Sequence, residues 1–405
     1  MKHPDWKLLY GLGLPSLGIT FGVTVLSAFL PTVLHGLANP IVVGLVIGAE
    51  GLFGLFMPII MGALVDRVKK VHDRLRYLVP ATIAMAVALA LMGVFDNLAF
   101  IAVMVGLFYV GYYAYLAPYW ALYPDLIPKK FSGRSRSAES VWRVMGSLTA
   151  LVSGGFLITL WQPLPFIVGA CLVVGATMWL GWYVGTLPDK AVRHQRKRLS
   201  ESFRSQWDLL YHNAPIRNLA IANALWNAAL RSILAFVVLF FTIGLGRSHG
   251  FVSGFVFPVA AIGIGIMAPL SGKLADRYGH VRVLAIASLV YGIGDLLPGI
   301  TQESWVFACV PLVAAAAATV MTLPYAALMR LLNGETHGEV SGLFGFSRGV
   351  GSFAGPLLAG LAVELGRGFF ASTQGYAAFW LATGAYVLIS LFFLWRLDVT
   401  SPRSV

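Results

Sequence analysis

Twelve apolar stretches, each long enough to cross a lipid bilayer as a helix, constrain this chain more than any other feature. They lie at 12–36, 40–65, 77–95, 98–124, 136–160, 164–187, 214–244, 250–275, 281–301, 304–331, 338–364 and 371–396. About 20 helical residues cross the hydrocarbon core. Only 11% of the residues are charged, against roughly 25% in soluble domains. The sequence therefore predicts an all-α membrane protein and excludes a soluble enzyme, a nucleic-acid-binding protein and a secreted disulfide scaffold.

The basic residues predict the orientation of these helices. Of the 29 Lys and Arg residues, three lie well inside predicted spans (Arg143, Arg231, Arg348) and two in odd-numbered loops (Arg247, Arg367). All others lie in the termini, in the even-numbered loops or at the span ends beside them. Because cytoplasmic loops collect Lys and Arg, both termini are expected in the cytoplasm, with the protein in the cell (inner or plasma) membrane. The first apolar stretch is too long for the core of a signal peptide, so none is expected.

The longest polar stretch predicts the division of the chain. Residues 188–213 are expected to form a basic cytoplasmic linker between a six-helix bundle at 1–187 and another at 214–405. Such a linker can lie on the anionic leaflet, or bind a regulatory partner. The only two cysteines, Cys171 and Cys309, lie in apolar runs, and the eight histidines are scattered. No disulfide, metal site or cofactor is expected.

The two halves of the chain share three sequence patterns. Gly62-Ala-Leu-Val-Asp66-Arg67 recurs as Gly272-Lys-Leu-Ala-Asp276-Arg277, Pro118-Tyr119-Trp-Ala-Leu as Pro324-Tyr325-Ala-Ala-Leu, and Arg143 with Gly146-Ser147 as Arg348 with Gly351-Ser352. Such a repeat indicates duplication. Two parallel six-helix repeats are typical of secondary transporters whose halves rock about a central site. We therefore expect twelve transmembrane helices in two pseudo-symmetric six-helix bundles.

The pattern G-x-L-x-D-R-x-G is complete from Gly272 to Gly279 and resembles the loop signature of the major facilitator superfamily; the first copy has Lys69 where a second glycine is usual. Two further passages resemble the sucrose/proton symporter and glycoside-pentoside-hexuronide:cation symporter group. They are Glu50-Gly-Leu-Phe-Gly-Leu-Phe-Met-Pro58 and Ala121-Leu-Tyr-Pro-Asp125-Leu-Ile-Pro128. The resemblance implies the major facilitator fold and proton-coupled uptake of a small sugar or glycoside. It also implies functional positions in spans two, four and five, matched by Glu50, 118–126 and Arg143.

Two acidic residues inside predicted spans are candidates for proton coupling. Glu50 lies near the middle of span two, and Asp295 lies in span nine. Burial favours the neutral form of a carboxyl, so such a group can take up a proton. Alternatively, Glu50 is permanently paired with an arginine. Gly292-Ile-Gly-Asp295 resembles an intramembrane aspartyl protease motif, but the second carboxylate that such catalysis needs is missing. The chain is not expected to be an enzyme.

Polar and aromatic residues inside the spans are candidates for substrate binding. Arg143 and Arg348 occupy equivalent positions in the two halves, and a guanidinium offers five donors. Span seven carries Asn223, Asn227 and Arg231 on one helical face. In span four, aromatic rings beside Pro118 suit a sugar face. The predicted substrate-binding residues are Arg143, Arg348, Arg231, Asn227, Asn223, Tyr119 and Trp120; the alternatives are helix–helix hydrogen bonds and structural ion pairs.

Charged residues at the cytoplasmic ends of the spans are predicted to form conformational latches. Asp66 and Asp276 end spans two and eight, where an anion can meet the N-terminus of another helix. The full predicted set is Asp66, Arg67, Asp276, Arg277, Asp125, Arg136 and Glu139. Solvated helix ends are the alternative interpretation.

The sequence therefore predicts a secondary active transporter, with proton-coupled sugar uptake by alternating access as the first hypothesis. A proton-antiporting exporter of amphipathic compounds is the alternative, because Gly351-Ser-Phe-Ala-Gly355-Pro356 in span eleven resembles an antiporter signature. Transport of organic anions is a third possibility, since three arginines face two evident acids inside the spans. A structural or receptor role is disfavoured by the charges inside the spans. The expected partners are a small substrate, protons and the bilayer, with the protein as a monomer.

Overall fold

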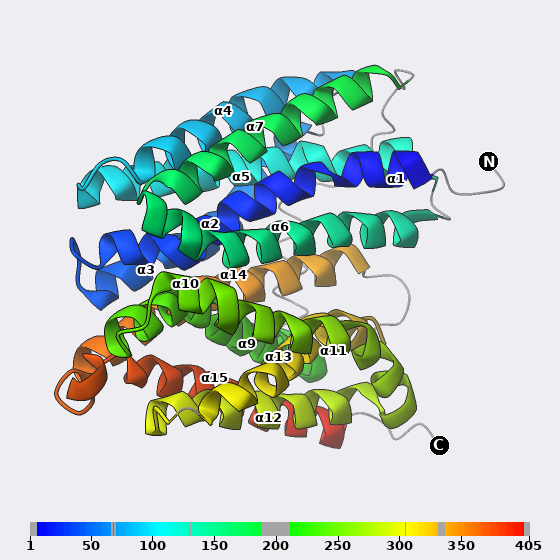
Figure 1. Ribbon diagram of the computed structural model, residues 1–405. Helices are drawn as coiled ribbons and strands as arrows, with labels where there is room; N and C mark the ends of the chain where they lie inside the picture. Colours follow the sequence, from blue (N-terminus) through cyan, green and yellow to red (C-terminus); the bar gives the residue numbers. More distant parts are fainter. Residues whose placement is uncertain are drawn as a thin grey trace. The chain divides into compact units, whose positions relative to one another are not determined.

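The computed structural model describes residues 6–65, 68, 70–128, 131–187, 211–303, 305–330 and 337–400. Within these ranges, twelve helices are long and apolar enough to cross a membrane. The predicted all-α membrane fold is confirmed, and most span boundaries fall within a few residues of the expected ones (Figure 1).

The chain divides into two compact units, one of residues 1–37 and 56–197 and the other of 38–55 and 198–405. The sequence placed the division in the 188–213 linker, of which residues 188–210 lie outside the described part. The difference lies in α3 (Pro40–Val65), because its first sixteen or so residues pack with the second unit rather than with their own half of the sequence.

The first unit consists of helices that run lengthwise beside one another. They are α1 (Trp6–Gly13), α2 (Pro15–Leu34), the later part of α3, the short η1 (His72–Arg74), α4 (Leu75–Met92), α5 (Leu98–Leu126), α6 (Ser132–Leu160) and α7 (Leu164–Gly185). Helix α2 packs against α6 and α7, and α4 packs against α5 and α7 (Figure 1). Asn97 begins α5 as an N-cap whose side chain accepts a hydrogen bond from the Phe100 N–H at 3.0 Å.

The first span is broken, although the sequence predicted it as one helix from 12 to 36. It begins earlier, at Trp6, and is interrupted at Leu14 between α1 and α2. Pro15 has no N–H to donate to the carbonyl of Gly11. The Leu17 N–H bonds to the carbonyl of Leu14 at 3.0 Å, one residue closer than in an α-helix. The break therefore leaves main-chain carbonyls of α1 available to side chains.

The second unit is built around α9. Its elements are the start of α3, α9 (Ala214–Leu239), the π-helical η3 (Phe240–Gly244), α10 (His249–Phe251), the π-helical η4 (Val252–Val256), α11 (Phe257–Tyr278), α12 (His280–Ile300), α13 (Val306–Arg330), α14 (His337–Gly366), η5 (Ala371–Thr373) and α15 (Ala377–Thr400). Helix α9 packs against α14 and α15. Trp226 of α9 is fully buried, and its indole N–H donates to Ser288 Oγ of α12 at 3.1 Å and to Ser390 Oγ of α15 at 2.8 Å.

Glycines let α14 approach two other helices at backbone distance. A Cβ on Gly351 would lie 2.0 Å from the carbonyl oxygen of Ala224 in α9. At the contact of α14 with α3, a Cβ on Gly44 of α3 would lie 2.1 Å from the carbonyl oxygen of Pro356 in α14. Any side chain at these positions would force the helices apart. This close packing against α14 explains why the start of α3 belongs to the second unit.

We expect Gly351→Ala to lower the Tm of the purified protein clearly, because overpacking a tight contact costs ~1–3 kcal/mol or more. Gly345→Ala is the matched control on the same helix, since a Cβ there meets nothing within 4 Å. It should leave the Tm unchanged or slightly higher, because Ala favours a helix over Gly. Equal Tm values for the two variants, measured in the same detergent, would contradict the close packing of α14 on α9.

Candidate functional site

A line of polar side chains follows one face of α9 in the second unit. The Asn223 amide donates to Ser347 Oγ at 2.8 Å and to the carbonyl of Phe344 at 3.3 Å, both in α14. The Asn227 amide donates back to the Asn223 carbonyl at 2.8 Å. Both asparagines are buried. Their hydrogen bonds tie α9 to α14, which was one of the two interpretations of this stripe; substrate contact stays a prediction.

The same line ends in an ion pair between Arg231 of α9 and Glu50 of α3. The Glu50 side chain is only 4% exposed and that of Arg231 16% exposed. The two residues meet because α3 lies so close to α14: a Cβ on Gly51, next to Glu50, would lie 2.3 Å from the carbonyl oxygen of Gly349. The sequence singled out both residues for different roles, and it left a Glu50–arginine pair open as an alternative. The structure shows that pair.

Arg143 and Arg348 present charged side chains at the surfaces of their own units. Arg143 lies on α6 of the first unit and Arg348 on α14 of the second, and both are exposed. Neither forms an ion pair with another described residue. A charged side chain within a membrane span is costly in lipid and is expected to face water or protein. A role for either guanidinium in substrate binding stays a prediction.

Asp295 lies in the interior of the second unit, on α12, and is 1% exposed. A Cβ on Gly384 of α15 would lie 2.9 Å from the carbonyl oxygen of Gly292, so α12 and α15 are in backbone contact one turn away. Thr383 of α15 is the hydroxyl neighbour of the carboxyl. Within the described residues no basic side chain pairs with Asp295. A carboxyl in this position is far cheaper to bury neutral than ionised, and its role in coupling stays a prediction.

The predicted latch residues fall into four groups. Asp66 and Arg67 lie outside the described residues. Asp276 and Arg277 are exposed at the end of α11, where the Arg277 guanidinium lies over the Tyr278 ring at 5.2 Å. Neither observation tests a latch.

Asp125 forms an ion pair with Arg74 of η1 at 2.7 Å, and the Arg74 side chain is 5% exposed. Sequence reasoning missed Arg74, because it lies in a basic loop beside Arg76 and resembles the other residues of the positive-inside pattern. A neighbouring acid at the end of span four was the one available signal.

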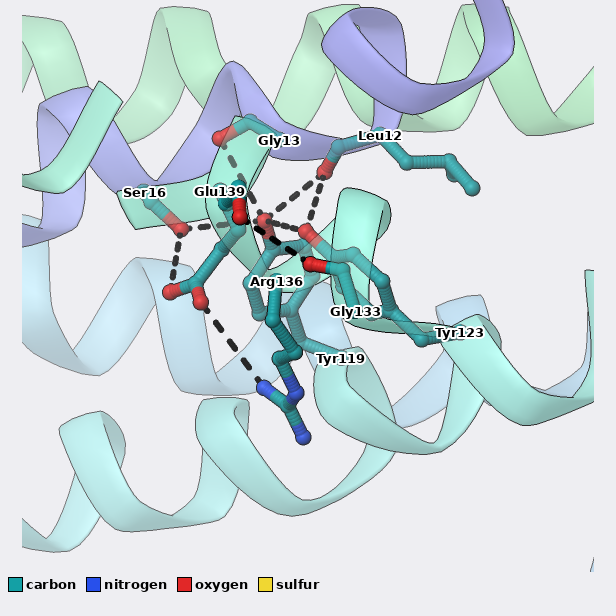
Figure 2. A network of polar contacts seen from close by, with 9 residues as sticks. Leu12, Gly13, Ser16, Tyr119, Tyr123, Gly133, Arg136 and Glu139 are labelled. Carbon is teal, nitrogen blue, oxygen red and sulfur yellow. Dashed lines mark hydrogen bonds and ion pairs between the residues drawn. The ribbon is translucent and has the colours of Figure 1, made fainter. Parts of the chain in front are cut away.

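Tyr119 and Glu139, predicted for substrate binding and for a latch, are joined in one hydrogen-bonded network of the first unit (Figure 2). Tyr119 is fully buried. Its hydroxyl donates to the Leu12 carbonyl at 2.7 Å and lies 3.0 Å from Ser16 Oγ. Ser16 Oγ donates to Glu139 Oε1 at 3.2 Å, and Arg136 lies 3.7 Å from the other carboxylate oxygen. Tyr119 thus makes its polar contacts inside the unit, not at a surface.

Trp120 points differently from its neighbour Tyr119. It is 38% exposed, and the Arg136 guanidinium lies 5.6 Å from its ring centroid. This cation–π contact occupies one face of the ring; a substrate role for Trp120 stays a prediction.

The sequence of this chain is similar to those of known membrane proteins. The sequence profile of the Major Facilitator Superfamily matches residues 16–268 and 250–405. The multidrug resistance protein MdtG of Dickeya zeae (strain Ech586) is 25% identical over 362 residues, which cover 87% of this chain and 83% of that protein. The MdtG protein of Serratia proteamaculans (strain 568) is also 25% identical, with 87% and 82% covered.

Solved structures share the fold. A bacterial homolog of the human lysosomal transporter Spinster, inward-facing and unoccupied, has a TM-score of 0.80 at 16% identity and covers 97% of this chain and 96% of its own. The nucleoside transporter NupG has a TM-score of 0.78 at 14% identity, with 98% and 100% covered. At these identities the likeness concerns the fold alone. The chain belongs to the Major Facilitator Superfamily: it is a multi-pass membrane transporter of small molecules and not an enzyme.

Proposed function

We propose that this protein exports amphipathic small molecules in exchange for protons. The observation that carries the proposal is the Glu50–Arg231 ion pair, a carboxylate and a guanidinium held in the interior of membrane-spanning helices. Sugar uptake was the first expectation from the sequence. The relatives described above are named for multidrug resistance, which favours the alternative of export.

A proton on Glu50 would change the preferred arrangement of α3 and α9. While Glu50 is ionised, the pair is neutral as a whole and holds the two helices together. A proton removes the negative charge of Glu50 and with it the attraction to the mostly buried Arg231 guanidinium, which is unfavourable. The protein then favours an arrangement in which Arg231 reaches water or a substrate. A proton bound on one side of the membrane thereby biases the conformational equilibrium.

A specific observation favours organic anions as a second candidate substrate class. Arg143 and Arg348 are exposed within membrane-spanning helices and have no ion-pair partner among the described residues. The charge that these helices offer to an aqueous path is therefore positive. A guanidinium binds a carboxylate, sulfonate or phosphonate with two parallel hydrogen bonds. Amphipathic compounds with an acidic group combine both candidate classes.

The test uses the purified protein in lipid vesicles with an imposed pH gradient. Labelled probes of four kinds are compared: an amphipathic anion, an amphipathic cation, a neutral amphipath and a disaccharide. We expect uphill movement of an amphipath against the proton flow, lost when a protonophore collapses the gradient. Movement of the disaccharide alone, in the same direction as the protons, would overturn export in favour of sugar uptake.

Arg143→Ala is expected to weaken binding of a transported anionic amphipath by ~1–3 kcal/mol, the range for a charge-assisted hydrogen bond, which is roughly 5- to 150-fold in Kd. Arg143→Lys should recover only part of this loss, because lysine keeps the charge but lacks the planar guanidinium that donates two parallel hydrogen bonds. Arg134→Ala is the control, since Arg134 lies at the start of the same helix over the Phe131 ring. If titration calorimetry gives the same Kd for Arg143→Ala and the parent, Arg143 does not bind the substrate.

A further inference from the structure

The break in the first span is held by side chains from neighbouring helices. The Trp142 indole N–H of α6 donates to the Tyr10 carbonyl at 3.0 Å, and the Trp179 indole N–H of α7 donates to the Gly11 carbonyl at 3.1 Å. The Gly11 carbonyl is the one that Pro15 cannot reach. Carbonyls left open in a membrane-spanning segment need such donors, because the bilayer offers none.

The next carbonyl, that of Leu12, lies at the end of a chain of hydroxyl groups that leads to Glu139 (Figure 2). Tyr119 and Tyr123 donate to it at 2.7 Å and 3.2 Å, and their own hydroxyls lie 2.9 Å apart. Ser16 lies 3.0 Å from Tyr119 and 3.2 Å from Glu139. With the longer contact from Tyr119 to the Gly13 carbonyl at 3.4 Å, these are six oxygen–oxygen contacts at hydrogen-bond distance, each of which needs a hydrogen.

Counting hydrogens separates two states of this chain. With Glu139 ionised, three hydroxyl groups supply three hydrogens, and Ser16 must give its own to the carboxylate. The single hydrogen of Tyr119 is then shared between Ser16 and the Leu12 carbonyl. With a proton on Glu139, the carboxyl donates to Ser16, Ser16 donates to Tyr119, and Tyr119 is free to donate to Leu12. The added proton fills one more contact and reverses the direction of the chain.

We propose that Glu139 is a second proton-binding site of this transporter, separate from Glu50, and that its proton is relayed through Ser16 and Tyr119 as a tighter hold on the Leu12 carbonyl. A hydronium ion gives up the proton by breaking one of its O–H bonds and is left as water, and the proton forms an O–H bond with Oε1 of the carboxylate. Ser16 and Tyr119 keep their own hydrogens and only turn them toward new acceptors. Protonation of the first unit then stiffens the break between α1 and α2, and loss of the proton loosens it.

The groups that face Glu139 come from three helices. On its own helix, Arg136 lies 3.7 Å from Oε2, a distance that gives attraction to the ionised form without a hydrogen bond. The Arg136 side chain is half-exposed, so water screens this attraction. Helix α5 contributes the Tyr119 and Tyr123 hydroxyls, and α2 contributes Ser16. No carboxylate or second cation of the described residues is in contact with Glu139.

The test measures proton binding on the full-length protein in lipid vesicles without substrate. Infrared difference spectra between acid and alkaline pH report each carboxyl that gains a proton through its C=O stretch. We expect one titrating carboxyl signal of the parent protein to be lost in Glu139→Gln and kept in Glu50→Gln. Because Glu50→Gln removes the other proposed proton site, comparison of the two variants shows which of the two proposals fails. Identical titrating signals in the parent and in Glu139→Gln would overturn the proposal.

One further variant and one further measurement test the relay. Ser16→Ala keeps the carboxyl but removes its neighbour, so the Glu139 signal should persist and shift toward that of a carboxyl without a hydrogen bond. An unshifted signal would overturn the relay. At a single alkaline pH, Glu139→Gln mimics the protonated form, and we expect slower main-chain hydrogen exchange at residues 12–17 than in the parent. Equal exchange rates at these residues in the variant and the parent would show that Glu139 does not affect the break.

Discussion

Glu50→Gln is expected to abolish transport driven by a pH gradient while leaving substrate-for-substrate exchange intact. The amide resembles the protonated carboxyl permanently, so the step that needs a proton to leave cannot occur. Exchange of substrate across the membrane involves no net proton movement and does not need that step. The variant should also fold, because a neutral amide is cheaper to bury than a carboxylate.

The two processes are measured in the same reconstituted vesicles, with exchange followed by labelled substrate and coupled transport by uphill accumulation. Glu303→Gln is the matched control, because Glu303 is exposed in the loop before α13. It should behave like the parent in both assays. Gradient-driven accumulation by Glu50→Gln would place the coupled proton elsewhere, and Asp295→Asn would be the next variant. If both variants remained coupled, a sodium-linked or uncoupled mechanism would be the better account.

Arg231→Ala is expected to cost about 3–5 kcal/mol of stability, since it strands the buried Glu50 carboxylate without its counter-charge. The double variant Glu50→Gln/Arg231→Ala should recover most of this loss, because no uncompensated charge remains.

These effects are measured as the Tm of the purified protein in one detergent. Arg217→Ala controls for the loss of an arginine from the same helix, because Arg217 is exposed near the start of α9. If Arg231→Ala and Arg217→Ala have the same Tm, the ion pair contributes nothing to the fold, and its role in coupling loses its physical basis.

The spans, the repeat and the superfamily were predictable because each depends on a pattern within one segment or between two aligned segments. Hydrophobic runs of about 20 residues are read directly from the sequence, as is the recurrence of Arg143 as Arg348. The pairing of Glu50 with Arg231 was not, since the two residues are 181 positions apart and meet only through the close approach of α3 to α14.

The finer family interpretation is not supported by the relatives, which are named for multidrug resistance. The passage from Glu50 to Pro58 resembles sugar symporters, but Gly51 within it serves the backbone contact with Gly349 at a would-be Cβ distance of 2.3 Å. A glycine required by helix packing carries no information about the substrate. Likewise, Tyr119 stands beside Pro118 in a row of aromatic residues, and nothing local indicates that its hydroxyl bonds to the first span.

The break at Pro15 shows the same limit. The proline is visible in the sequence, and the interruption follows from its missing N–H. The donors that compensate it come from α5, α6 and α7, and no pattern within span one indicates them.

The tryptophan at the centre of the second unit has a consequence for how the protein is made. Trp226 enters the membrane with α9, but its partners Ser288 and Ser390 follow 62 and 164 residues later. Synthesis at ~5–20 residues per second therefore leaves this indole N–H waiting for seconds before α12 arrives, and longer before α15. Since α15 packs along both α9 and α12, the second unit closes only when its last helix has been inserted. A ribosome stalled before α15 would release a protein whose second unit has an open core.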